Sequence, residues 1–272
     1  MRGKKVMVVT LCALLLFEAL AFASVSLDQQ KALADEATFY STASDGFLLA
    51  DDPIYNNANT APNADEVYDG YTYIMIGQRY FFQAGPGHVI HRSAVFFDTS
   101  SLPDSAVVTS ATLSLFGFSD DSDTDFEITV VDGSPLIPPL ALSDYGLLRG
   151  QTISGGAFNT SGFSTIGYND IPLNALGIGW ISKTGMTNFG LRSSRDIEAN
   201  DGFPNDNEFV AVYSSDYEEP GGFWPKLVVN YYVPSASVPT LSQWGMIAMG
   251  LLFAAFLVWS VRRRWVVSTD KS

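Results

Sequence analysis

Residues 106–118, AVVTSATLSLFGF, carry the clearest pattern in the chain. Ala111, Leu113 and Leu115 fall on one side of a period of two, and the residues between them fall on the other. A β-strand points successive side chains to opposite faces, so this stretch predicts a strand with Leu113 and Leu115 facing a core. The same side-chain direction leaves Phe116 and Phe118 on the opposite face.

Short segments of similar character surround this strand. Val, Ile, Tyr, Phe and Thr are common in them, as strands prefer, and Gly, Pro, Asp and Asn punctuate the gaps. We expect a loop over 51–70 and one short helix within 173–182. The predicted strands are 37–41, 46–50, 71–76, 78–83, 88–98, 106–118, 126–131, 188–192, 209–214 and 226–233. Many short strands with almost no helix predict an all-β fold, a single antiparallel β-sandwich.

A resemblance narrows this prediction for the body of the chain. Residues 92–103, RSAVFFDTSSLP, followed by SATL at 110–113, resemble a pattern in jelly-roll domains of carbohydrate-binding-module family 96 and the disaggregatase-related kind. The resemblance implies one jelly-roll domain over residues 37–233, with carbohydrate as an expected ligand. Arg92 and Arg192 lie on predicted strands, where we expect them to pair with carboxylates at a sheet edge.

The first residues have the composition of a secretory signal. Basic residues at 2–5 precede an apolar run at 6–17, and Ala21 and Ala23 form a small-residue cleavage site. This predicts a signal peptide over 1–23, followed by a polar arm over 24–36. The only cysteine, Cys12, lies inside the signal, so the mature chain is expected to hold no disulfide or thiolate site.

The last residues combine three features in a fixed order. A linker and motif occupy 234–244, an apolar run suited to a transmembrane helix covers 245–261, and 262–272 form a basic tail predicted to be cytoplasmic. Arg262, Arg263 and Arg264 stop the span and place the body on the opposite, periplasmic side of the inner membrane. The motif reads VPTLSQWG over 238–245.

This tail resembles the IPTL-CTERM class of bacterial protein-sorting signals, with Val238 where isoleucine is usual. The matching residues are Val238, Pro239, Thr240, Leu241, Trp244 and Gly245. The resemblance implies recognition and cleavage by an exosortase-type membrane transpeptidase. The body would then pass from the inner membrane to the cell surface or extracellular matrix. A plain single-span anchor is the alternative interpretation.

Charge restricts the partners of the body. The chain carries a formal charge of −14, and residues 24–238 hold 8 Lys and Arg against 27 Asp and Glu. Such a body repels nucleic acid and anionic headgroups, so we expect neither as a partner. Oxygen ligands in the loops 120–125 and 201–208 suggest a structural Ca²⁺ held by Asp201, Asp206 and Glu208, and a solvated acidic surface is the other interpretation.

Catalytic patterns are weak. His88 and His91 point to opposite faces of one predicted strand, so that strand cannot supply a two-histidine metal site. Two functions are therefore kept: a non-catalytic surface protein, and a polysaccharide-active enzyme with a carboxylate pair. A groove lined with aromatics and lacking such a pair would favour the first. Burial in the sandwich core or under a loop is the alternative interpretation for the aromatics available for a sugar, which are Tyr71, Tyr73, Tyr80, Phe116, Phe118, Tyr217 and Trp224.

Overall fold

The computed structural model describes residues 34–81, 87–202, 207–218 and 222–234, together with 245, 247–256, 258 and 259 in the tail. The chain divides into two compact units, Met1–Pro234 and Ser235–Ser272. We call the described residues of the first unit, 34–234, the head.

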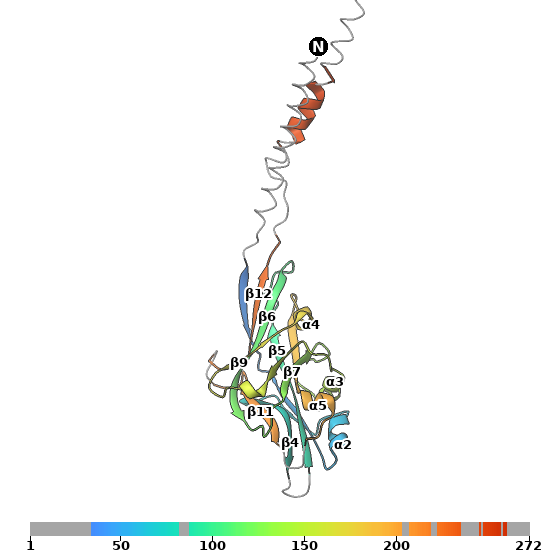
Figure 1. Cartoon of the computed structure of the whole chain (residues 1–272), viewed down its shortest axis with the longest axis vertical. Helices are drawn as coiled ribbons and strands as arrows, with labels where there is room; N and C mark the ends of the chain where they lie inside the picture. The colour runs from blue at the N-terminus through green and yellow to red at the C-terminus, as the bar shows by residue number, and fades with distance from the viewer. Residues whose placement is uncertain are drawn as a thin grey trace, which may run out of the picture. The chain divides into compact units, whose positions relative to one another are not determined.

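Antiparallel strands make up most of the regular secondary structure of the head (Figure 1). The strands are β1 (Asp35–Tyr40), β2 (Gly46–Asp52), β3 (Glu66–Tyr68), β4 (Tyr73–Phe81), β5 (Gly87–Asp98), β6 (Val107–Asp120), β7 (Glu127–Asp132), β8 (Gly156–Asn159), β9 (Tyr168–Pro172), β10 (Met186–Ser193), β11 (Asn207–Tyr213) and β12 (Lys226–Tyr232). The helices are short: α2 (Tyr55–Thr60), α3 (Asp144–Arg149), α4 (Ala175–Gly179), α5 (Ser194–Glu198) and the 3-10 turn η1 (Thr160–Gly162).

The strands form one sheet that curls back on itself. Its order is β1-β12-β6-β11-β4-β5-β10-β7-β8, with β9 beside β6 and with β2 and β3 beside β5. The main core lies between the two arms of this curl. Leu113 and Leu115 of β6 enter it from one arm, and Val95 and Phe97 of β5 enter it from the other. All four side chains are fully buried, as apolar side chains between two layers of strands should be.

A second core covers the outer face of β2, β5 and β7. Leu48, Ile90 and Phe96 point into it, where Tyr145 and Leu148 of α3 cover them. Figure 1 shows α2, α3 and α5 gathered on this one side of the head. Alternate residues of β5 therefore enter different cores, and the strand is buried on both faces.

The predicted all-β antiparallel fold is confirmed, and its strands join in a single curled sheet. The two strands predicted at 71–76 and 78–83 form a single strand, β4, which continues through Gly77. The predicted helix in 173–182 is α4. The expected loop over 51–70 was wrong in part, because it contains α2 and β3. The sequence pattern did not predict α3, α5, β8 and β9, because their four to six residues are too few for a clear period.

The predicted segments at both ends lie largely outside the described residues. This applies to the signal peptide with Ala21 and Ala23, to most of the sorting motif, and to Arg262, Arg263 and Arg264. Residues 245, 247–256, 258 and 259 are helical. Within the described part of the chain, no helix has the length and apolar character required of a membrane span.

Candidate ligand-binding cavity

A cavity of about 240 Å³ opens on the head beside β2, β3 and β4. It is lined by Phe47, Leu49, Tyr68, Tyr71, Tyr73, Met75, Arg79 and His91. Five of these eight side chains are aromatic, counting the imidazole, and one carries a positive charge. No aspartate or glutamate is among the described residues that line it.

Strand geometry explains why the cavity forms at this place. His91 of β5 is paired with Leu49 of β2 on one side and with Gly77 of β4 on the other, so residues of three strands share its face. The pairing of β4 with β5 ends at Gly77, and the earlier part of β4 pairs only with β11. Gly77 has φ 127°, a conformation that favours glycine. The departure of β4 from β5 leaves room beside the His91 ring.

The walls are fixed by ring-to-ring packing. Phe47 and Tyr68 stack with centroids 4.6 Å apart and planes 14° apart. Tyr71 meets Tyr68 edge to face at 4.8 Å and Tyr73 at 5.8 Å. Tyr71 is 46% exposed, so one ring of the group remains open to solvent. Aromatic pairs in these arrangements stabilise each other, so each of these rings packs against a neighbouring ring.

His91 is the fully buried polar group among the residues that line this cavity. Its side chain is fully buried, between Phe47 at 5.6 Å and Phe209 at 6.2 Å. Neither Nδ1 nor Nε2 has a hydrogen-bond partner among the described residues. Burial, and to a smaller extent the charge of Arg79, lowers the pKa of His91 to about 3. The ring is therefore neutral near pH 7, with one nitrogen able to donate and the other able to accept.

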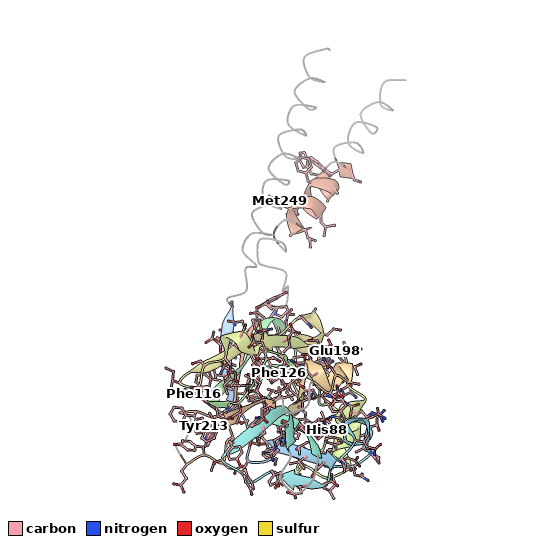
Figure 2. The ribbon with its side chains drawn as sticks, turned by 60° about the horizontal axis from the view of Figure 1, so that its bottom comes forward. His88, Phe116, Phe126, Glu198, Tyr213 and Met249 are labelled. Carbon is pink, nitrogen blue, oxygen red and sulfur yellow. The ribbon has the colours of Figure 1, made fainter. Side chains whose placement is uncertain are left out.

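A row of aromatic rings leads away from the cavity across β4, β6 and β11. Tyr73 stacks on Phe118 at 5.4 Å with planes 4° apart, and Phe118 meets Tyr213 at 5.2 Å. Beyond Tyr213, the row continues to Phe223 at 5.1 Å and from Phe223 to Phe116 at 4.3 Å. Figure 2 shows Phe116 and Tyr213 close together at the edge of the head. We call Tyr73, Phe118, Tyr213, Phe223 and Phe116 the aromatic row.

The structure separates the aromatics that the sequence singled out. Tyr71 and Tyr73 line the cavity, Phe116 and Phe118 belong to the aromatic row, and Tyr217 packs against that row. Two lie elsewhere: Tyr80 contacts His88, and the Trp224 indole donates a hydrogen bond to the Tyr217 carbonyl. The cavity roles of Phe47, Tyr68 and His91 were not predicted from the sequence, because they depend on the register of β2, β4 and β5.

Arg92 and Arg192 do pair with a carboxylate, but the expected place was wrong. Both side chains are buried on the central strands β5 and β10, and both bind Asp196 of α5. Burial alone would raise the pKa of Asp196, and the hydrogen bonds and charges of the two arginines lower it below its usual value. This trio holds the helical side of the head to the sheet.

The candidate calcium ligands are not brought together by the described residues. Glu208 is buried, where it accepts a hydrogen bond from Thr124 and lies 3.4 Å from Nη2 of Arg195. Asp201 is exposed, and Asp206 lies outside the described part. In the loop 120–125, Asp120 accepts from the backbone of Ser122. Within the described ranges, no three His, Cys, Asp or Glu side chains are placed to share a metal ion.

Comparisons with known proteins bear on the tail alone. No curated protein matches the chain, so the resemblance of the body to carbohydrate-binding jelly rolls has no support from relatives. The resemblance of the tail is confirmed: residues 236–264 match the family model of the IPTL-CTERM motif.

Proposed function

We propose that this chain is an exported, non-catalytic surface protein whose C-terminus is recognised and processed by an exosortase-type transpeptidase. The observation that carries the proposal is the match of residues 236–264 to the IPTL-CTERM motif. The order of the sequence supports it, because a signal-like N-terminus precedes the head and a basic cluster closes the tail.

The proposal includes the stages of this route. The signal peptide is removed after Ala23, and 245–261 hold the chain in the inner membrane with the head in the periplasm. The transpeptidase then cuts near the motif and transfers the head to the cell surface or the extracellular matrix. In this proposal a plain membrane anchor would keep Ser272, whereas a sorted protein would lose it.

The head is proposed to be a jelly-roll-like binding domain for carbohydrate. Support comes from the cavity and the aromatic row, because flat apolar rings suit the C–H faces of sugars. A polysaccharide-active enzyme would need two carboxylates flanking the scissile bond. The described lining of the cavity offers Arg79 and His91 and no carboxylate, which favours binding over hydrolysis. A structural Ca²⁺ remains a separate proposal for the exposed acidic loops.

Mass spectrometry of the protein from cells with and without the sorting enzyme tests the route. We expect a C-terminus cut near the motif only when the enzyme is present. A matched pair of variants sharpens the test: Trp244→Ala changes the motif and should block cutting, whereas Trp259→Ala makes the same change within the apolar run and should not. An intact C-terminus through Ser272 in both strains would overturn the proposal.

A further inference from the structure

We propose that the cavity beside His91 binds one six-membered sugar ring of a glycan chain, and that His91 hydrogen-bonds its hydroxyl groups. This rests on the proposed carbohydrate-binding role of the head and assigns it a site.

A buried imidazole with two unpartnered nitrogens is unfavourable for folding. Buried polar groups almost always have a hydrogen-bond partner, and each unsatisfied one loses the bonds it made to water. His91 lines the cavity, and its nitrogens find no partner among the described residues. Its natural partners are therefore groups that enter the cavity.

The neutral ring selects the chemistry of those groups. One nitrogen donates and the other accepts, so a ligand needs both an acceptor and a donor beside the His91 ring. A hydroxyl group can both donate and accept a hydrogen bond. A carboxylate accepts only, and an ammonium donates only, so either would leave one nitrogen unsatisfied.

The walls select the rest of the ligand. A sugar ring presents apolar C–H groups on its faces and hydroxyls at its edge. Tyr68, Tyr71 and Tyr73 offer aromatic surface to the ring faces, and His91 offers its two nitrogens to the hydroxyls at the ring edge. The cavity volume of about 240 Å³ suits a single sugar unit.

The aromatic row extends the site from a sugar unit to a chain. It begins at Tyr73, which also lines the cavity, and Phe118 in the row is 47% exposed. The units that follow the bound ring on the Tyr73 side would therefore contact further aromatic faces. We infer that longer oligosaccharides bind more tightly than monosaccharides.

The test uses the purified full chain in a detergent without sugar headgroups. Titration calorimetry would follow hexasaccharides of glucose, mannose, galactose, N-acetylglucosamine and uronic acids. We expect at least one to bind and its monosaccharide to bind at least tenfold more weakly. The absence of binding to every member would overturn the site and the carbohydrate-binding role, and would leave the tail-processing result unaffected.

Three variants locate the binding. His91→Phe keeps a ring between Phe47 and Phe209 and removes both nitrogens, so we expect an unchanged or raised melting temperature and at least tenfold weaker binding. Tyr71→Ala should also weaken binding at least tenfold. Tyr40→Ala, the same change at a similarly exposed tyrosine (44% against 46%) that is not among the cavity-lining residues, should bind as the parent does. Binding that survives His91→Phe and Tyr71→Ala would overturn the site while leaving the proposed function intact.

Discussion

The guanidinium of Arg92 and the carboxylate of Asp196 meet at 2.6 Å between Nη2 and Oδ1, and neither side chain is exposed to solvent. Nε of Arg192 binds Oδ2 of the same carboxylate at 2.6 Å. Arg92 also donates to the carbonyls of Asn59 and Tyr145, which belong to α2 and α3. One carboxylate therefore joins two sheet strands to the helices that cover them.

Replacing Asp196 should destabilise the head strongly. Asp196→Asn keeps the shape but leaves two buried guanidiniums without a counter-charge, and breaking a buried ion pair in this way costs about 3–5 kcal/mol. Thermal and urea unfolding of the full chain would measure the loss. Asp98→Asn makes the same chemical change at an exposed turn, where the side chain caps Ser100. Equal unfolding of the two variants would show that the trio does not stabilise the fold.

The sequence predicted part of this arrangement. Arg92 and Arg192 stood out as cations on predicted strands. Their partner Asp196 was not predicted, because it lies on a helix of five residues, which is too short to show a helical period. A local signal was present, because Ser193 accepts a hydrogen bond from the backbone of Asp196 as a helix cap. That cap would have predicted α5, although not its position over the two arginines.

Gly77 should tolerate no side chain. It has φ 127°, and a Cβ atom there would lie 2.0 Å from the carbonyl oxygen of Glu208. Strain and crowding together predict that Gly77→Ala costs about 2–4 kcal/mol. Gly185→Ala is the matched control, since no atom lies within 4 Å of its added Cβ. Chemical unfolding of both variants checks this, and a Gly77→Ala protein as stable as Gly185→Ala would contradict it.

The cavity shows what a sequence of this kind leaves undetermined. The period of two correctly placed His88 and His91 on opposite faces of β5, where the Tyr80 and Tyr55 rings meet His88 and the cavity meets His91. It could not show that Leu49 and Gly77 flank His91, because pairing between strands far apart in sequence depends on the whole sheet. Nor could it predict that β5 is buried on both faces, although consecutive apolar residues at 89–90 and 94–97 hint at this.

Glu208 should stabilise the fold through its ion pair with Arg195 and not by binding calcium. Glu208→Gln keeps an oxygen for the Thr124 hydroxyl and removes the charge opposite Arg195, which should cost about 1–3 kcal/mol. We expect the same loss in EDTA and in millimolar calcium. Asp104→Asn, at an exposed position outside both acidic loops, should leave the unfolding midpoint unchanged in both buffers. A Glu208→Gln loss that appears only with calcium would instead identify Glu208 as a metal ligand.

Asp45 should make the head less stable as the pH rises from about 4 to 7. Its carboxylate is fully buried and accepts hydrogen bonds from Ser41 and Ser215. Burial raises its pKa from 3.8 to about 6, and these hydrogen bonds offset part of that rise. The folded protein thus holds a proton that the unfolded chain releases. Its stabilising effect is complete below pH 3.8 and is lost as the pH passes through about 6.

Asp45→Asn isolates this contribution. The amide stays neutral at every pH, and its oxygen and nitrogen can bond Ser215 and Ser41. Unfolding free energies measured from pH 4 to 7 should therefore fall for the parent relative to the variant, by up to about 3 kcal/mol. Asp98 gives the opposite direction, because its hydrogen bonds with Ser100 lower its pKa, so the parent should gain relative to Asp98→Asn as the pH rises. Parallel pH profiles for the parent and Asp45→Asn would show that Asp45 ionises normally in the folded head.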